Sequence, residues 1–347
     1  MKRQVTNMLQ LAVVAMLLLL ACGSVKQPGD ASIDVPRIDA PVDGPPQFTS
    51  CMGLTATCGF GANESCCRAE PVPGGTFYRG YDMATDNYND MGYPATVSSF
   101  VLDTYEVTVG RFRAFVNAGL GTAISPPAGG AGAHSKLANS GWDSAWNTSL
   151  VADTGALTFA VNCGSSSQTW TDAPGPNENK PMNCVSWYEA MAFCIWDGGY
   201  LPTEAEWNYA ASGGSEQRAY PWSNPADSLI ISCSHANYLT SDPSVEWCVS
   251  SETSGATNRV GSESATGDGR WHHSDLAGNV DEWTLDYYAS AYPMPCNDCA
   301  NLTPSSARMR RGGSFTFIAP FQRAAFRFSN IPAGRFVSIG LRCARAS

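Results

Sequence analysis

Residues 311–327 read Arg-Gly-Gly-Ser-Phe-Thr-Phe-Ile-Ala-Pro-Phe-Gln-Arg-Ala-Ala-Phe-Arg, a stretch in which short apolar runs are broken by glycine, proline and polar residues. Glycine and proline mark turns and loops, so this texture disfavours a long helix or strand. The same texture runs through most of the chain before this stretch. It predicts loops and short strands on a small helical frame. The stretch holds neither cysteine nor histidine, which bears on its chemistry.

Helices are expected at three places where a capping residue precedes an apolar run. Ser186 with Glu189, and Thr203 with Glu206, match the pattern in which a hydroxyl and a carboxylate satisfy the first free N–H groups of a helix. A third helix is expected to start at Thr108. The large indoles are expected in the core, at Trp187, Trp196, Trp207, Trp222 and Trp283.

Seven blocks follow one another along the chain: Pro73-Gly-Gly-Thr-Phe-Tyr-Arg-Gly80, Tyr105-Glu-Val-Thr-Val-Gly-Arg-Phe112, Pro181-Met-Asn-Cys-Val-Ser-Trp187, Leu201-Pro-Thr-Glu-Ala-Glu-Trp207, Tyr220-Pro-Trp222, Leu276-Ala-Gly-Asn-Val-Asp-Glu-Trp283 and Arg311-Gly-Gly-Ser314. In this order they resemble the blocks of the formylglycine-generating enzyme family, also called the sulfatase-modifying factor family. The resemblance covers residues 70–347. It implies an irregular α+β fold with little regular secondary structure, related to C-type lectin domains.

The amino terminus is similar to a bacterial lipoprotein signal. Lys2 and Arg3 precede the apolar run of residues 9–21, which is too short to span a bilayer as a helix and ends at Cys22. Acylation of Cys22 would give a stable membrane anchor. An ordinary secretory signal followed by a chance cysteine is the alternative. Gly23 resembles the residue found in lipoproteins of the outer membrane, so we expect a lipid-anchored protein there, facing the periplasm or the cell surface.

The chain is expected to have four segments: a signal peptide (1–21), a lipidated disordered tether rich in proline (22–48), a disulfide-rich knot (49–69) and the sulfatase-modifying-factor-like domain (70–347). Loss of the signal peptide leaves 19 basic and 31 acidic residues, a net charge of −12. This charge argues against nucleic acid as a partner and against electrostatic docking on anionic lipid.

Eight of the 17 arginines follow residue 307. We expect these arginines to pair with partly buried carboxylates, because the guanidinium group suits buried ion pairs. A basic ligand-binding pocket is the alternative interpretation.

Thirteen cysteines, less the lipidated Cys22, leave an even number for disulfides in an oxidising compartment. Closeness in sequence suggests three pairs, and the four cysteines of the knot are expected to close on themselves: Cys163–Cys184, Cys233–Cys248 and Cys296–Cys299, with Cys51, Cys58, Cys66 and Cys67 in the knot. The family resemblance implies a further link from Cys194 to Cys343.

A zinc site is the alternative reading of the Cys296-Asn-Asp-Cys299 stretch, with His272 and His273 as the other ligands. A disulfide is the stronger expectation, because an oxidising compartment favours it.

Residues 275–282 are the best candidate for a metal site. Calcium takes oxygen ligands from carboxylates and backbone carbonyls, which a glycine-containing loop can supply. The resemblance implies that a structural calcium ion is held by Asp275, Gly278, Val280 and Glu282, and that Asn237 and Tyr238 belong to a second site. A purely structural turn, with Glu282 paired to an arginine, is the alternative.

The oxygen-dependent enzymes of the family hold copper with two cysteines, three and eight residues after the serine of the Arg-Gly-Gly-Ser block. Here these positions are Phe317 and Gln322, and soft thiolates are the ligands that suit Cu(I), so copper is not expected. The resemblance places a pocket at Ser314, Arg327 and Asp281. The alternative is that Ser314 and Arg327 simply hold the Gly-Gly turn and its ion pairs.

Two functions remain open from the sequence. The first is an outer-membrane or surface lipoprotein whose domain binds a protein, peptide or glycan without redox chemistry. The second is an oxidoreductase of the family with altered active-site chemistry.

Overall fold

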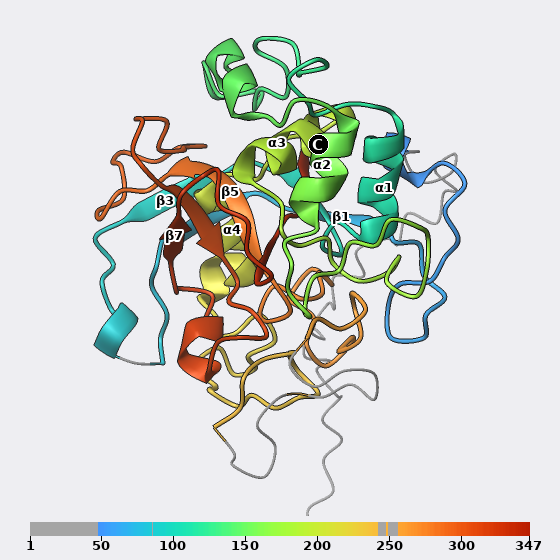
Figure 1. Ribbon diagram of the computed structural model, residues 1–347. Helices are drawn as coiled ribbons and strands as arrows, with labels where there is room; N and C mark the ends of the chain where they lie inside the picture. Colours follow the sequence, from blue (N-terminus) through green and yellow to red (C-terminus); the bar gives the residue numbers. More distant parts are fainter. Residues whose placement is uncertain (1–47, 85, 242–247, 249–255) are drawn as a thin grey trace, which may run out of the picture. The chain divides into compact units, whose positions relative to one another are not determined.

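The computed structural model describes residues 48–84, 86–241, 248 and 256–347. These residues form an α+β fold with few helices and short strands, as predicted (Figure 1). The helices are α1 (Val109–Asn117), α2 (Thr154–Val161), α3 (Trp187–Trp196) and α4 (Glu204–Ala211), with the 3-10 turns η1 (Thr49–Cys51), η2 (Asp86–Tyr88), η3 (Ser144–Ser149), η4 (Gly214–Glu216) and η5 (Ala319–Gln322). Among the residues described, no helix has the length and apolar character needed to cross a membrane.

Three helices begin at the predicted capping residues. The side chain of Thr108 accepts the N–H of Arg111 at the start of α1, while Ser186 and Thr203 form complete capping boxes at α3 and α4. Satisfying these N–H groups stabilises a helix start by about 1 kcal/mol.

Helix α2 was not predicted. Only Leu157 and Val161 of its residues are buried, so the sequence carries no clear amphipathic period. Its start is fixed by Asp153, whose carboxylate accepts the N–H of Ala156 at 2.9 Å. An aspartate cap without a buried stripe is too weak a pattern to identify a helix.

The strands form three small sheets: β1 (Ala69–Val72), β4 (Phe100–Asp103) and β9 (Ala344–Ala346); β2 (Gly75–Tyr78) and β3 (Pro94–Val97); and β7 (Phe328–Asn330), β6 (Arg308–Arg311), β5 (Asp281–Tyr287) and β8 (Ile339–Gly340). All neighbours are antiparallel except β5 and β8. Figure 1 shows α1, α2 and α3 gathered in the upper part and α4 beside β5. The carboxyl-terminal strand thus pairs with strand β4 from the early part of the domain.

The core prediction holds for three of the five tryptophans. Trp187, Trp207 and Trp283 are fully buried. Trp196 is partly buried at the edge of the core, and Trp222 is partly buried and stacks on a tyrosine ring. The two exceptions lie where short helices and turns leave one face of the indole uncovered.

All twelve cysteines of the described residues form disulfides: Cys51–Cys67, Cys58–Cys66, Cys163–Cys184, Cys194–Cys343, Cys233–Cys248 and Cys296–Cys299. Four of these pairs are those that sequence proximity and the family resemblance suggested, and the four knot cysteines pair among themselves as expected, in a connectivity that the sequence left open. Because Cys296 and Cys299 form a disulfide, they offer no thiolates to a zinc ion. His273, another ligand of the alternative zinc site, is buried with its Nε2 3.3 Å from the carbonyl oxygen of Leu102. The Cys194–Cys343 link ties α3 to the end of the chain.

The start of the described chain is anchored in the body of the protein. Phe48 is buried under the guanidinium group of Arg345, at 3.7 Å from the ring centroid. The N–H of Ser50 donates to Asp197, and the hydroxyl of Ser50 accepts from Arg111. Residues 45–347 form one compact unit, which includes the disulfide knot.

Seven of the eight carboxyl-terminal arginines pair with acidic side chains, as predicted: Arg310, Arg311, Arg323, Arg327, Arg335, Arg342 and Arg345. The eighth, Arg308, is an exception. Its guanidinium group lies between the rings of Tyr287 and Trp187, at 3.3 and 3.6 Å from their centroids. Cation–π contact replaces a carboxylate there, and burial lowers the pKa of Arg308 to about 10.

Candidate functional site

The Arg311-Gly312-Gly313-Ser314 block forms a tight turn after β6. Gly312 and Gly313 have φ angles of 104° and 70°, which glycine adopts without strain. The N–H of Gly313 donates to Asp281 at 3.1 Å, and Arg310 donates to the other oxygen of that carboxylate. Burial raises the pKa of Asp281 to about 6, although Arg310 and the Gly313 N–H act against it. Asp281 therefore holds the turn from inside the protein.

Gln322 braces the same turn. Its side chain is fully buried, and Nε2 donates to the carbonyl oxygens of Ser314 at 2.9 Å and Phe317 at 2.8 Å. Ser314 is also fully buried, with its hydroxyl 2.8 Å from that of Thr316. At the position where the family's copper enzymes carry their second thiol, this chain therefore has a structural amide.

Arg327 is committed to an acidic partner. Its Nε and Nη2 donate to the two oxygens of Glu204 at 2.6 and 2.8 Å, and its guanidinium carbon lies 4.0 Å from the ring centroid of Tyr292. Of the predicted pocket residues, Ser314 and Asp281 are buried and Arg327 is neutralised. In this structure Asp281 holds the Gly312-Gly313 turn and Arg327 pairs with Glu204. This arrangement matches the alternative interpretation, in which these residues hold the turn and its ion pairs.

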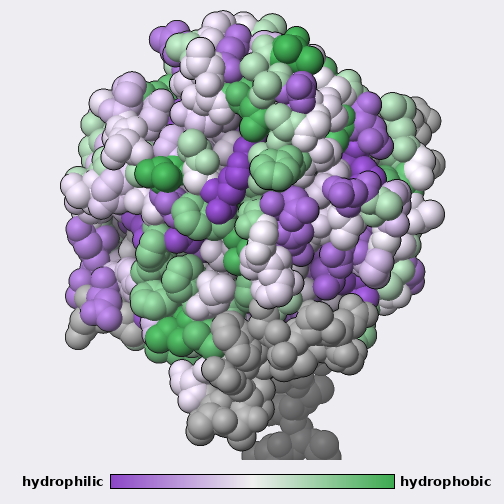
Figure 2. Space-filling view, in the orientation of Figure 1, coloured by the Kyte–Doolittle hydropathy of each residue, from purple (hydrophilic) through white to green (hydrophobic). Residues whose placement is uncertain are grey.

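Phe317 belongs to a cluster of four phenylalanines, which we call the phenylalanine cluster: Phe317, Phe321, Phe326 and Phe328. Neighbouring ring centroids lie 4.9 to 5.6 Å apart. Figure 2 shows apolar residues gathered over η5 and β7, at the lower left. An aromatic surface thus stands where the first thiol of a copper pair would be.

The predicted calcium loop lies between α4 and the carboxyl-terminal segment. Asp275 and Gly278 have positive φ angles of 58° and 88°, which curl the backbone. The carboxylate of Glu282 is buried, accepts the indole N–H of Trp207 at 2.7 Å and pairs with Arg342 at 2.7 Å. The alternative interpretation of this loop, a purely structural turn, required Glu282 to pair with an arginine. The ion pair with Arg342 meets that requirement.

Further carboxylates surround this loop. Glu106 accepts the side-chain amide of Asn279 at 2.6 Å and the N–H of Val280 at 3.0 Å. Burial, followed by the charges of Asp275 and Glu282, raises the pKa of Glu106 well above its usual range.

Glu263 lies in the same cluster. Burial and then Asp275 raise its pKa to about 8, and burial raises the pKa of Asp275 to about 6. One carboxylate oxygen of Glu263 is buried and has no hydrogen-bond partner among the described residues. Against the effect of its burial, the charges of Glu282, Glu106 and Asp275 raise the pKa of Arg342, and Glu263 lies beside Asp275. Within the described ranges, no three acidic, histidine or cysteine side chains come together as a ready metal site.

Asn237 also borders the loop, because its carbonyl oxygen accepts the N–H of Asn279 at 2.9 Å. Tyr238, predicted with it, is buried. Glu106 and Glu263 were not predicted as members of the site. Glu106 lies 174 positions before Val280, and Glu263, although only 12 positions before Asp275, stands in no metal-ligand pattern.

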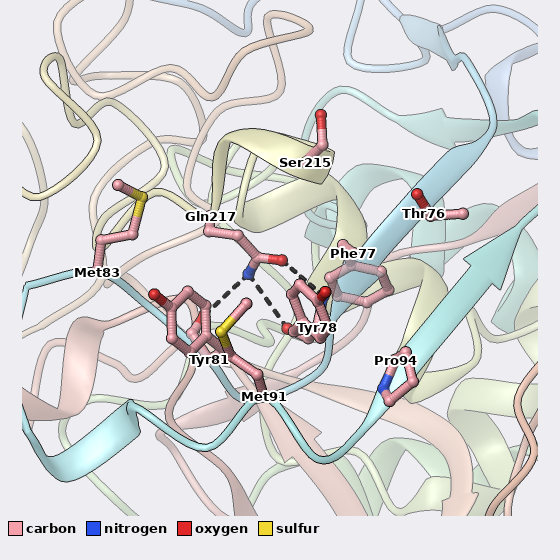
Figure 3. Close-up of a pocket in the computed structure, with 9 residues that line it drawn as sticks. All are labelled: Thr76, Phe77, Tyr78, Tyr81, Met83, Met91, Pro94, Ser215 and Gln217. Carbon is pink, nitrogen blue, oxygen red and sulfur yellow. Dashed lines mark hydrogen bonds between the residues drawn. The ribbon is translucent and has the colours of Figure 1, made fainter.

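A separate cavity of about 330 Å³ opens beside β2 (Figure 3). Its walls are mostly apolar and include two exposed methionines: Thr76, Phe77, Tyr78, Tyr81, Met83, Met91, Pro94, Ser215 and Gln217. Pockets with apolar walls and a few fixed polar groups bind ligands, and methionine side chains adapt to varied partners. No motif in the sequence indicated this cavity.

Gln217 shapes the floor of the cavity. Its Oε1 accepts the N–H of Tyr78 at 2.6 Å, and its Nε2 donates to the carbonyl oxygens of Tyr78 and Tyr81 at 3.1 and 3.0 Å (Figure 3). The side-chain amide of Gln217 thus makes the two hydrogen bonds with the backbone of Tyr78 that a neighbouring strand would otherwise make.

The rest of the outer edge of β2 faces the cavity. Tyr78 lies opposite Pro94, and Thr76 lies opposite Thr96. Thr96 uses its own N–H and carbonyl on its other side, toward residues 296 and 298. Alternation along an antiparallel ladder therefore directs the N–H and carbonyl of Thr76 outward, on the same side as those of Tyr78.

Comparison with known proteins identifies the family and supports the fold described above. A model of the sulfatase-modifying factor enzyme 1-like domain matches residues 62–347, so the chain belongs to this family. The formylglycine-generating enzyme of Streptomyces coelicolor is 30% identical over 296 residues, covering 79% of this chain and 87% of the relative. The inactive C-alpha-formylglycine-generating enzyme 2 of Bos taurus is 28% identical over 186 residues, an alignment that covers 50% of this chain and 55% of the relative. PvdO from Pseudomonas aeruginosa shares the fold, with a TM-score of 0.55 at 20% identity over 80% of this chain and 94% of its own. The family therefore includes inactive members as well as formylglycine-generating enzymes.

Proposed function

We propose that this protein is a lipid-anchored surface or outer-membrane protein whose domain binds an extended peptide segment of a partner protein, without the copper and thiol chemistry of its enzymatic relatives. The observation that carries the proposal is the apolar cavity beside the outward-facing edge of β2. The pairing of all described cysteines and the burial of Gln322 support the absence of redox chemistry. Acylation of Cys22 supplies the anchor.

The peptide binds as an added strand. Main-chain hydrogen bonds to Thr76 give affinity, and one apolar side chain of the peptide enters the cavity between Tyr81 and Met91. The lining includes no charged side chain, which favours an uncharged residue at that position of the peptide.

A display library of random peptides, selected on residues 45–347, tests this site. The enriched peptides are expected to bind the Met91→Asp variant at least about tenfold more weakly in a calorimetric titration, because a charge enters the apolar wall. Ile230→Asp is the matched control, since Ile230 is exposed and does not line the cavity. Enriched peptides that bind Met91→Asp as well as the parent protein would contradict the site. Selective binding on a glycan array, with no peptide enriched, would contradict the ligand class.

Aldehyde formation is expected to be absent. Residues 45–347, incubated with copper, oxygen and a cysteine-containing sulfatase peptide, should produce no aldehyde by mass spectrometry, because Phe317 and Gln322 offer no thiolate. The Streptomyces coelicolor enzyme is the positive control. Stoichiometric copper with oxygen-dependent aldehyde formation would support the oxidoreductase alternative instead.

Calcium is proposed to bind among the buried carboxylates around Asp275. The unpartnered oxygen of Glu263 and the excess of buried acids over Arg342 favour a hard cation with oxygen ligands, and Gly278 and Val280 would add their carbonyl oxygens. Glu282 contributes less than the resemblance implied, since its carboxylate already accepts from Trp207 and Arg342. The ion would stabilise the loop rather than act on a ligand.

Addition of calcium to EDTA-treated protein is expected to raise Tm by about 5 °C at a concentration 100 times Kd, because binding to the folded state alone stabilises it. The shift should vanish in Asp275→Asn and persist in Asp227→Asn, a change at an exposed acid. An equal Tm with calcium and with EDTA in the parent protein would count against the ion.

A further inference from the structure

Three apolar side chains project from the disulfide-rich knot. Met52, Leu54 and Phe60 are 69, 38 and 71% exposed. Residues 52–63 contain no charged side chain, in a chain whose net charge is −10. We call the surface formed by residues 52–63 the knot surface. Exposed large apolar side chains within one uncharged segment make that segment a candidate interaction site.

The knot surface is held in a fixed shape. The Cys51–Cys67 disulfide fixes the residue just before it, and the Cys58–Cys66 disulfide ties down its middle. From the body of the domain, Arg259 donates to the carbonyl oxygens of Gly59 at 3.2 Å and Phe60 at 3.1 Å. The apolar side chains therefore stay outward instead of collapsing onto the domain.

The nearest acid is neutralised within the domain. Glu64, the first acid after the knot surface, pairs with Arg68 at 2.6 Å and accepts the hydroxyl of Tyr105 at 2.9 Å. The knot surface thus presents no free anion to a partner of negative charge, unlike the acidic chain as a whole.

The position of the knot along the chain favours a lipid bilayer as the partner of the knot surface. Cys22 precedes Phe48, the first described residue, by 26 positions. A chain of that length reaches at most ~90 Å in any conformation. If Cys22 is acylated, the knot (drawn in blue at the right of Figure 1) is the part of the described chain nearest to the lipid in sequence, and the connection to Cys22 gives it a high effective concentration at the bilayer.

We infer that the knot surface docks on the bilayer that holds the lipid anchor, with Met52, Leu54 and Phe60 inserted among the headgroups. This inference rests on the proposed acylation of Cys22. Apolar insertion, not charge, provides the attraction, which agrees with the uncharged surface and the acidic chain. Docking orients the domain with the knot toward the membrane and restricts where a peptide partner can approach.

The test uses the full lipidated chain, reconstituted in vesicles of phosphatidylethanolamine and phosphatidylglycerol. Hydrogen exchange by mass spectrometry compares this sample with the unlipidated Cys22→Ser chain in buffer without detergent. Backbone amides of residues 52–63 are expected to exchange at least about tenfold more slowly on vesicles, while residues 154–161 are unchanged. The triple variant Met52→Ser, Leu54→Ser, Phe60→Ser should lose this protection and still float with the vesicles. The control pair Ile124→Ser and Phe159→Ser, at exposed apolar residues elsewhere, should keep it.

Three outcomes would overturn the inference. Flotation without slower exchange in residues 52–63 removes the docking and leaves the lipid anchor standing. Equal protection in the unlipidated chain in buffer indicates a second copy of the chain on the knot surface instead of lipid. Failure of the full chain to float removes the anchor and the docking together. The melting temperature of the triple variant, expected to equal that of the parent, checks that loss of protection does not come from unfolding.

Discussion

Replacing Arg342 with methionine is expected to lower the free energy of unfolding by about 3–5 kcal/mol, because it leaves the buried carboxylate of Glu282 without its cation. The side chains of Arg342 and Glu282 are both fully buried. The guanidinium group also donates to the carbonyl oxygens of Asp103 at 2.9 Å, Thr104 at 2.6 Å and Ser274 at 2.7 Å. One side chain therefore joins the end of the chain to two distant segments. Urea unfolding followed by circular dichroism measures the loss.

Two further variants separate charge from packing. Adding Glu282→Gln to Arg342→Met should recover part of the loss, since the uncompensated charge is then gone. Arg68→Met, at a surface pair with 40 and 38% exposed side chains, should cost less than about 1 kcal/mol. A loss at Arg342 no larger than at Arg68 would contradict the assigned role.

Removal of the Cys194–Cys343 disulfide by a double change to serine is expected to cost about 4–5 kcal/mol. The link closes a loop with a sequence separation of 149, so its absence returns much conformational freedom to the unfolded chain. Thermal and urea unfolding of the purified variant measure the effect.

The Cys296–Cys299 link provides the comparison within the same protein. Its sequence separation is only 3, so chain entropy predicts a cost of about 1.5 kcal/mol for its removal. Equal costs for the two links would show that loop entropy is not the source of the stabilisation. A disulfide map that finds Cys194 or Cys343 as a free thiol would show that this link does not form, and would contradict the expected cost of its removal.

Several features followed from the sequence because their causes are local. Ser186 and Thr203 start helices through hydrogen bonds to residues three positions away, and the Cys296–Cys299 link joins near neighbours. The Gly312-Gly313 turn needs positive φ angles that glycine adopts freely. The order of the family blocks then identified the family over residues 70–347, and the family model matches residues 62–347. The absence of cysteine at 317 and 322 is likewise a fact of sequence.

The partners of those residues depended on tertiary structure. Composition predicted ion pairs for the late arginines, but only the fold decided that Arg342 meets Glu282 and that Arg308 lies between aromatic rings. Gln322 is polar and could have lined a ligand pocket, yet the turn around Ser314 buries it as a brace. Arg342 and Glu282 are 60 positions apart in the sequence, so no local pattern encodes their pairing.

The candidate binding site shows the same division most clearly. The strand block that begins at Pro73 was evident from the sequence, whereas the cavity beside it needs Gln217 to pair with Tyr78 across 139 positions. The sequence by itself determined the family, the helix starts and the loss of the thiol pair. Only the tertiary structure decided where a ligand surface exists, because a cavity is formed by side chains that the folding of distant segments brings together.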